Sequence, residues 1–309
     1  MEEEKQLLIN PNPTLQSYYN SLESRIGYRI FLGGTRHFGY YDEGAWWPFP
    51  INRALRRMED HLFQCLNLPS GARILDAGCG VGHVAMYMAR QGLRVEAIDV
   101  VQHHVVKARR NVQADGLQKA VNVNLMDYHH LENFADASFD GVYTMETLVH
   151  ATDPERVLSQ FYRLMKPGGH IAMHEYDHIP EDRIPQEGIN PRRVKSTERV
   201  NRLAAMPGNQ KFEYGVLKTM LENQGFEDVV LKDITDHLTP LIMLFFVVAY
   251  VPWMLIQFLG LEHRFVNTEA GVWGYWAHKR RYSRYVVLTA KKPAGTVAGE
   301  NDLRQRRAV

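Results

Sequence analysis

Short apolar runs alternate with amphipathic segments through the middle of the chain. Five such runs are short, which is typical of β-strands. They occupy residues 73–78, 94–99, 121–127, 139–145 and 169–176. Helical spacing of apolar residues separates them, for example at 83–92 and 153–169. This alternation predicts right-handed βαβ units, a parallel sheet and helices on both of its faces.

The pattern also predicts how the rest of the chain is organised. Helical periodicity at 14–31 and 51–67 flanks an irregular aromatic stretch at 37–50. Two further strands are expected, at 227–234 and 282–292. We therefore expect an N-terminal helical and aromatic arm (1–68), an α/β core (69–235), an apolar insertion (236–281), a last core strand (282–293) and a disordered tail (294–309).

The apolar insertion contains a run without charged side chains. Residues 239–261 read TPLIMLFFVVAYVPWMLIQFLGL, which is long enough to cross a bilayer, since a crossing needs roughly 20 residues. A single crossing is excluded if the strands before and after the run are neighbours in one sheet. Three alternatives remain: a bent helical pair, broken or kinked at Pro252, that walls an acceptor pocket; contact with one membrane leaflet; or a homodimer interface. The first two point to a lipophilic ligand.

Charge and cysteine content exclude some classes of function. The 309 residues carry 36 basic and 35 acidic side chains, a formal net charge of +1. Nucleic-acid binding is not predicted, because it usually requires a basic stripe. The two cysteines, Cys65 and Cys79, suit a reducing compartment. We expect a cytoplasmic protein, with membrane contact at its periphery as one alternative.

A histidine motif at 174–178 resembles a zinc site but lies in the wrong structural context. The residues read H-E-Y-D-H and follow an apolar, strand-like run. Zinc binding by this motif requires a helix, where both histidines share one face. On an extended strand the two imidazoles would be about 13 Å apart. The sequence therefore predicts no metal here.

The first strand ends in a glycine-rich turn, and the next two strands end in acids. Residues 76–82 read D-A-G-C-G-V-G, while Asp99 and Asp127 end the second and third strands. Glycines at such a turn let a ligand approach the backbone, and a carboxylate after the second strand can accept both ribose hydroxyls. The spacing differs from the dinucleotide fingerprint because His83 replaces the small sixth residue. A nucleoside-containing ligand is predicted.

These segments resemble class I S-adenosylmethionine-dependent methyltransferases. The resemblance is carried by D-A-G-C-G-V-G, A-I-D, F-D-G-V-Y-T-M-E-T-L-V-H-A and L-M-K-P-G-G, and the E-T-L-V-H-A segment is similar to the sterol-methyltransferase-like branch. It implies a Rossmann-like seven-stranded sheet with an antiparallel last strand, and S-adenosylmethionine as cofactor. The glycine loop would hold the methionine part, Asp99 the ribose, and Asp127 with Tyr128 the adenine. The implied cofactor-binding residues are Asp76, Gly78, Cys79, Gly80, Gly82, Asp99, Val100, Asp127 and Tyr128.

Candidate catalytic residues follow the fourth and fifth strands. The resemblance implies that Glu146 lines the cofactor and that His150 faces the acceptor, where a base helps methyl transfer to oxygen or nitrogen. The alternative for His150 is capping of the next helix. Glu175 either points into the acceptor site or is a solvated charge.

Aromatic side chains are the candidate substrate contacts, because aromatic faces would stabilise the cation formed on alkene methylation. The arm contributes Tyr40, Tyr41, Trp46 and Trp47, which would form either an aromatic lid or simple packing of the arm. Trp253 would add a contact from the insertion.

Three functions remain open at this stage. The first is methyl transfer to a lipophilic small molecule such as a sterol-, terpenoid- or polyketide-like compound, with carbon methylation favoured. The second is a cyclase or pericyclase that binds the cofactor without consuming it, because an apolar pocket beside a fixed sulfonium can fold a polyene. The third is a non-catalytic, cofactor-binding regulatory partner whose interface is the apolar run.

Overall fold

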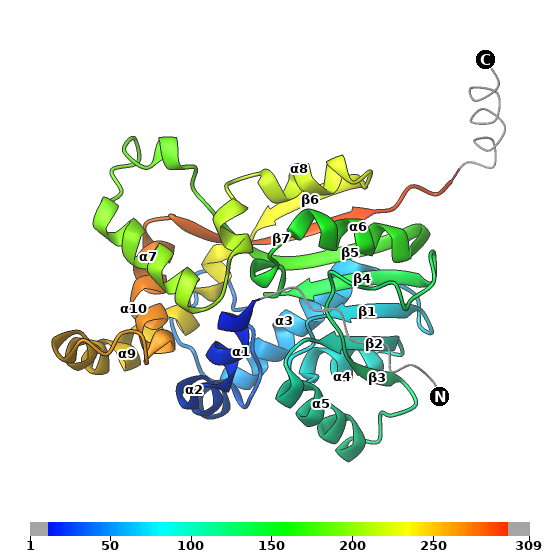
Figure 1. Cartoon of the computed structure of the whole chain (residues 1–309), viewed down its shortest axis with the longest axis horizontal. Helices are drawn as coiled ribbons and strands as arrows, with labels where there is room; N and C mark the ends of the chain where they lie inside the picture. The colour runs from blue at the N-terminus through cyan, green and yellow to red at the C-terminus, as the bar shows by residue number, and fades with distance from the viewer. Residues whose placement is uncertain (1–11, 296–309) are drawn as a thin grey trace.

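Seven strands form one mixed sheet in the order β3-β2-β1-β4-β5-β7-β6 (Figure 1). This computed structural model describes residues 12–295. The strands are β1 (Arg73–Ala77), β2 (Arg94–Asp99), β3 (Val121–Leu125), β4 (Phe139–Met145), β5 (Met165–His178), β6 (Glu227–Asp233) and β7 (Ser283–Lys291). The first five are parallel, and β7 is antiparallel to both β5 and β6. The predicted seven-stranded α/β fold with an antiparallel last strand is confirmed.

Helices cover both faces of the sheet. One face packs against α3 (Ile51–Leu66), α4 (His83–Arg90) and α5 (Gln102–Ala114), and the other against α6 (Pro154–Leu164) and α8 (Val216–Asn223). The sequence explains α6 well. Asp153 caps its first turn by accepting from the Arg156 amide at 3.0 Å, and Val157, Phe161 and Leu164 are fully buried at helical spacing. The helix ends five residues earlier than predicted because Met165 begins the long strand β5.

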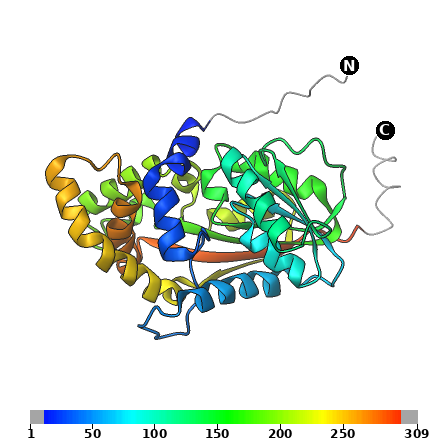
Figure 2. The same cartoon turned by 90° about the horizontal axis from the view of Figure 1, so that it is seen from below.

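A group of further helices gathers beyond one end of the sheet (Figures 1 and 2). They are α1 (Pro13–Asn20), α2 (Leu22–Leu32), α7 (Pro191–Leu203), α9 (Thr239–Leu259) and α10 (Val266–Lys279). The single helical segment expected at 14–31 is two helices, since Ser21 ends α1 and caps α2. Glu23 accepts hydrogen bonds from the amides of Asn267 and Thr268 at the start of α10, at 2.8 and 2.7 Å. The arm and the insertion are thereby joined.

The apolar run forms one long helix and not a bent pair. Helix α9 continues through Pro252 and packs against α10, so the helical pair consists of α9 and α10. Within residues 12–295, Thr235–Leu259 is the segment long and apolar enough to cross a membrane. Strands β6 and β7 pair directly, for instance at Val230 and Thr289, so α9 alone cannot be a crossing. Residues 1–11 and 296–309, which include most of the predicted tail, lie outside the described part.

Candidate active site

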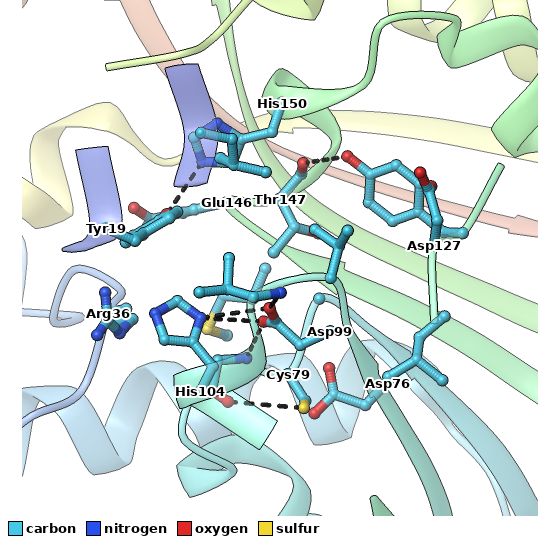
Figure 3. A pocket seen from close by; sticks show the side chains of 18 of the residues that line it. Tyr19, Arg36, Asp76, Cys79, Asp99, His104, Asp127, Glu146, Thr147 and His150 are labelled. Carbon is cyan, nitrogen blue, oxygen red and sulfur yellow. Dashed lines mark hydrogen bonds and ion pairs between the residues drawn. The ribbon is translucent and has the colours of Figure 1, made fainter. Parts of the chain in front are cut away.

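A cavity of about 460 Å³ lies where β1, β2 and β3 end, beneath α1 (Figure 3). Sites for small ligands and cofactors are commonly of this size. Side chains from these strand ends point into it together with side chains from the N-terminal arm. The side chains of the three strand ends lie together because the strands are parallel and their carboxyl ends share one edge of the sheet.

The glycine loop after β1 depends on close backbone contact. Gly78 has a φ of +102°, and a Cβ atom there would lie 2.6 Å from Cγ2 of Thr147. The Thr147 hydroxyl donates to the carbonyl of Ala77 at 2.6 Å. Glycine at this position therefore provides both the backbone conformation and the space for the segment after β4 to cross the loop.

Asp99 organises the loop from the end of β2. Its carboxylate accepts from the backbone amides of Gly80 and Val101, each at 2.8 Å, and from Nδ1 of His104 at 3.3 Å. Burial raises the pKa of Asp99, but His104 and the two amides outweigh burial and lower the pKa overall. Asp99 is therefore an ionised acceptor that faces the cavity.

Asp76 differs because its buried carboxylate is short of protein donors. Neither Oδ2 of Asp76 nor the neighbouring Tyr143 hydroxyl has a hydrogen-bond partner of acceptable geometry among residues 12–295. Burial raises the pKa of Asp76 to about 7, although Tyr143 opposes the rise. A buried carboxylate oxygen that lines a cavity and lacks a donor can accept from a ligand. It fits the ammonium group of a bound amino acid.

The other predicted cofactor residues divide into two groups. Cys79, Val100, Asp127 and Tyr128 line the cavity. The Tyr128 hydroxyl donates to the Thr147 carbonyl at 3.0 Å, and Asp127 accepts from the backbone amide of His129 at 2.9 Å. Gly82 does not line the cavity.

Gly82 instead serves packing between two helices. A Cβ atom there would lie 3.2 Å from Cβ of Ala108 in α5, so the residue allows α4 and α5 to approach. The prediction that Gly82 contacts the ligand is therefore wrong.

Several cavity residues come from the arm and were not predicted. Tyr19 and Gln16 line the cavity, and Gln16 donates to the Val100 carbonyl at 2.9 Å. Arg36 lies with its guanidinium carbon 4.9 Å from the ring centres of both Tyr19 and Tyr28. Its Nε and Nη1 are buried and have no hydrogen-bond partner among residues 12–295. No local motif marks Arg36, because its position depends on how the arm folds over the sheet.

A second, largely apolar cavity of about 520 Å³ adjoins the first. It lies between α2, α9 and α10, with Phe38, Phe245 and Val248 among its lining residues. The apolar insertion therefore walls a pocket, in agreement with one of the predicted alternatives. The two cavities share a common wall made of Tyr19, Arg36, His37, Glu146 and His150.

Glu146 and His150 both lie in the common wall, and their polar atoms bind protein groups. Glu146, at a left-handed φ of +59°, accepts from the Phe38 amide at 2.8 Å, the Tyr285 hydroxyl at 2.9 Å and the Tyr176 hydroxyl. Burial raises the pKa of Glu146. A carboxylate with three protein donors has little capacity left as a free base.

His150 is similarly occupied at both ring nitrogens. Its Nδ1 lies 2.8 Å from the Ala205 carbonyl, which can only accept, so Nδ1 carries the proton. Its Nε2 lies 3.1 Å from the Tyr19 hydroxyl and therefore accepts from it. Burial lowers the pKa of His150, which keeps the ring neutral. The alternative that His150 caps the next helix is wrong, because Asp153 caps α6.

Glu175 lies in neither cavity and is not exposed to solvent. Both predicted alternatives, a contact in the acceptor site and a solvated charge, are therefore wrong. The Glu175 side chain is fully buried and accepts from the backbone amides of Thr147 and Leu148 at 3.2 and 2.9 Å. Burial raises its pKa to about 7. The carboxylate stabilises the turn that carries His150 and is not placed to contact an acceptor.

The predicted aromatic lid is also corrected. Neither cavity is lined by the proposed lid residues, Tyr40, Tyr41, Trp46 and Trp47, or by Trp253, the predicted contact from the insertion. Trp46 and Trp47 are 75% and 58% exposed on the surface, and the Tyr41 hydroxyl donates to the Pro48 carbonyl at 2.9 Å. Trp253 packs edge-on against Trp273 in α10. The aromatic cover comes from Tyr19 and Tyr28 of α1 and α2.

Tyr40 packs against two histidines and lies outside both cavities. Its ring stacks on His61 and His237, with centroid distances of 4.9 and 4.2 Å. His174, the first residue of the H-E-x-x-H motif, lies on β5 and not on a helix, and its Nε2 is 2.9 Å from Nδ1 of His61. His174 thus contributes to packing between α3 and the sheet.

Comparison with known proteins agrees with this geometry. Residues 75–173 match the family described as "Methyltransferase domain". The chain is 43% identical over 280 residues to the S-adenosyl-L-methionine-dependent Diels-Alderase iccD of Talaromyces variabilis, which covers 90% of this chain and 94% of that protein. The chain belongs to the class I S-adenosylmethionine-dependent methyltransferase family. Its cofactor is S-adenosylmethionine, as predicted.

More distant similarities agree with the fold and with the predicted branch. The sterol 24-C-methyltransferase of Eremothecium gossypii is 29% identical over 274 residues, 87% of this chain and 68% of that protein. The solved structure of the [4+2]-cyclase SpnF superposes with a TM-score of 0.69 at 22% identity, covering 94% of this chain and 99% of that one. The predicted resemblance to sterol methyltransferases is confirmed.

Proposed function

We propose that this enzyme binds S-adenosylmethionine without consuming it and cyclises a lipophilic polyene by a [4+2] cycloaddition. The similar protein iccD, 43% identical, is named a Diels-Alderase that depends on the same cofactor. The structural observation that carries the proposal is the common wall, in which both predicted bases, Glu146 and His150, already bind protein donors or acceptors.

The two leading reactions differ in whether they need a base. Methyl transfer to oxygen or nitrogen releases a proton that a base must accept, and methyl transfer to an alkene carbon leaves a cation that must lose one. A [4+2] cycloaddition converts three π bonds into one and forms two carbon–carbon σ bonds. It releases no proton and no leaving group, so the engagement of Glu146 and His150 by protein groups is compatible with it.

The residues of the chain would act by folding and polarising the polyene. The second cavity would hold the diene and the alkene in contact and exclude water, which lowers the entropic part of the barrier. Arg36 offers two buried N–H groups without partners, and a hydrogen bond from them to a carbonyl conjugated with the alkene would withdraw electron density. When bound, the cofactor would supply a positive sulfonium charge. Asp76, Gly78, Gly80, Asp99 and Tyr128 would hold the cofactor in the first cavity.

Counting the demethylated cofactor per product tests the proposal. The purified protein would be incubated with S-adenosylmethionine and a linear polyene that carries a diene and an electron-poor alkene. We expect a ring product isomeric with the substrate and almost no S-adenosylhomocysteine. A product heavier by one methylene, with equimolar S-adenosylhomocysteine, would establish methyl transfer, the activity that the sterol methyltransferase at 29% identity supports.

A control with S-adenosylhomocysteine in place of the cofactor asks whether the sulfonium charge matters. Both molecules share the amino acid and nucleoside groups, but only S-adenosylmethionine carries the sulfonium charge. We expect slower cyclisation with the uncharged molecule. If no product forms from any polyene tested while cofactor binding is intact, the regulatory hypothesis gains support over both enzymatic ones.

A further inference from the structure

We infer that one face of the protein docks on an anionic lipid surface and enters a single leaflet. This docking face combines the outer side of α9 with the exposed arc of α2 and the loop between α2 and α3. Its exposed apolar members are Leu22, Ile26, Ile30, Trp46, Trp47, Phe49, Val247, Val251, Met254, Leu255, Phe258 and Leu259. Monomeric soluble proteins rarely expose a contiguous apolar surface of this kind without a partner.

Helix α9 is not the core helix that its composition alone would suggest. Only 17% of its most apolar window is buried inside the protein, and Phe258 is 87% exposed. The opposite side of the same helix lines the second cavity through Ile242, Phe245 and Pro252. The helix thus has apolar residues on two sides, of which the protein covers one.

The three parts of the docking face lie side by side. The rings of Phe31 in α2 and Phe245 in α9 are 6.3 Å apart, and Leu32, Tyr41 and Leu241 belong to one buried cluster. In Figure 2 the loop between α2 and α3 lies next to the yellow start of α9. Exposed tryptophans beside an apolar surface are typical of the membrane interface.

The geometry favours insertion into one leaflet and excludes a crossing. Strands β6 and β7, before and after the α9–α10 pair, are hydrogen-bonded neighbours. A crossing would require α10 to return through the bilayer, but its 14 residues span about 21 Å, less than the hydrocarbon core of about 30 Å. Helix α10 also packs against α7, so its other side is covered by protein.

The charges at the face favour lipid over a second copy of the chain, because, in the part of the chain that the structure describes, three unpaired arginines there exceed the one unpaired acid of the loop, Glu43, while Asp42 pairs with Arg57. Arg25 and Arg29 lie on the exposed arc of α2, and Arg264 follows α9. None of the three has an ion-pair partner within the described residues 12–295. A two-fold dimer would bring identical basic patches together and repel, whereas anionic headgroups attract each of them. We therefore assign the face to lipid.

Vesicle co-sedimentation of the full chain with bound cofactor tests the inference. Phosphatidylcholine vesicles with about a third phosphatidylserine would be compared with phosphatidylcholine alone. We expect binding that is stronger to the anionic vesicles and weaker at high salt. The double variant Leu255→Ser, Phe258→Ser should lower the partition coefficient at least about tenfold, because two large apolar side chains no longer enter the leaflet.

Two comparisons complete the design. Val230→Ser removes an exposed apolar side chain on β6, outside the docking face, and should leave vesicle binding unchanged. Arg25→Gln with Arg29→Gln should weaken binding to anionic vesicles only. Cofactor affinity, measured by calorimetry, should remain that of the wild type in every variant, since none of these residues lines the cofactor cavity.

The inference is overturned if the cofactor-binding wild-type protein does not sediment with either vesicle. It is also overturned if sedimentation velocity shows a dimer that Leu255→Ser, Phe258→Ser dissociates while no vesicle binding is seen, because the face would then belong to a second copy. Both readouts are independent of cyclisation. Failure of docking would therefore leave the proposed reaction intact, and failure of the reaction would leave docking intact.

Discussion

The hydroxyl of Tyr19 in α1 donates to Nε2 of His150, 3.1 Å away, in the wall that the two cavities share. The direction of this bond follows from the other nitrogen of the ring, which donates to the Ala205 carbonyl. The bond joins the N-terminal arm to the turn after β4. It therefore makes the arm part of the wall between the two cavities.

Tyr19→Phe should slow cyclisation by roughly tenfold to a hundredfold, since it leaves the buried Nε2 of His150 without a donor. The ring that packs against Arg36 is retained, so the dissociation constant of the cofactor should change by less than about threefold. Single-turnover rates and calorimetry would measure the two effects. Tyr250→Phe, on the exposed side of α9, is the matched control and should behave as wild type. An unchanged rate in Tyr19→Phe would show that the hydrogen bond from Tyr19 to His150 does not contribute to cyclisation.

Arg36→Met should reduce the cyclisation rate by about a hundredfold or more, the effect typical of losing one preorganised donor to a reacting carbonyl. Methionine keeps much of the aliphatic packing over Gly80, where an added Cβ would lie 3.3 Å from Cδ of Arg36. Stopped-flow assays under saturating cofactor would give the rate. If the variant instead loses cofactor affinity and regains the full rate at saturation, Arg36 binds the carboxylate of the cofactor and not the substrate.

Cofactor affinity should rise with pH through about 7, because burial raises the pKa of Asp76 to about 7 and only the ionised carboxylate attracts an ammonium group. Below that pH, binding must displace a proton, so affinity should fall by up to about tenfold per pH unit. Calorimetric titrations between about pH 5.5 and 7.5 would show the slope. Asp76→Asn should weaken binding by about ten- to a hundredfold at neutral pH and flatten the profile. A slope that survives in Asp76→Asn would assign the proton to another group.

Gly78→Ala should abolish cofactor binding and lower the free energy of unfolding by about 3 kcal/mol, because the new Cβ would lie 2.6 Å from Thr147. Gly71→Ala is a matched control, since Gly71 has a similar positive φ of +86° but open space around its Cβ position. It should cost only about 1 kcal/mol, the conformational part. Urea unfolding of both variants separates conformational strain from the clash. Equal destabilisation of the two would contradict the proposed close contact.

The contribution of His61 and His174 to the free energy of unfolding should decrease as the pH falls from about 6.5 to about 4. The contribution of Asp76 and Glu175, whose pKa values burial raises, has the opposite sign. Burial lowers the pKa of His61 to about 4 and that of His174 well below its usual value, so in this window the two histidines bind more protons in the unfolded chain. The loss should be on the order of 2 kcal/mol, allowing for the partial exposure of His61. His61→Gln retains a hydrogen-bonding side chain beside His174 but cannot titrate. The stability difference between wild type and His61→Gln should therefore change with pH by this contribution, and a difference that is constant from about pH 6.5 to about 4 would reject the assignment.

The sequence by itself determined the sheet, the glycine loop and the cofactor. Strands such as 139–145 and 227–233 are predicted almost to the residue, because alternation of apolar runs with amphipathic helices reflects local burial that any βαβ unit requires. Asp76, Asp99 and Asp127 are found for the same reason: each lies in, ends or closely follows a strand, and parallel strands bring their ends to one edge.

Only the tertiary structure decided what surrounds the cofactor cavity. Tyr19 and Arg36 cover the site, and Tyr40 and Trp47 do not, because the direction of the arm is set by contacts between α2 and the distant helices α9 and α10. Glu175 has the sequence position of a candidate acid, yet it lies on the buried side of β5 and binds backbone amides. Such outcomes depend on side-chain direction and long-range packing, which a residue pattern does not contain.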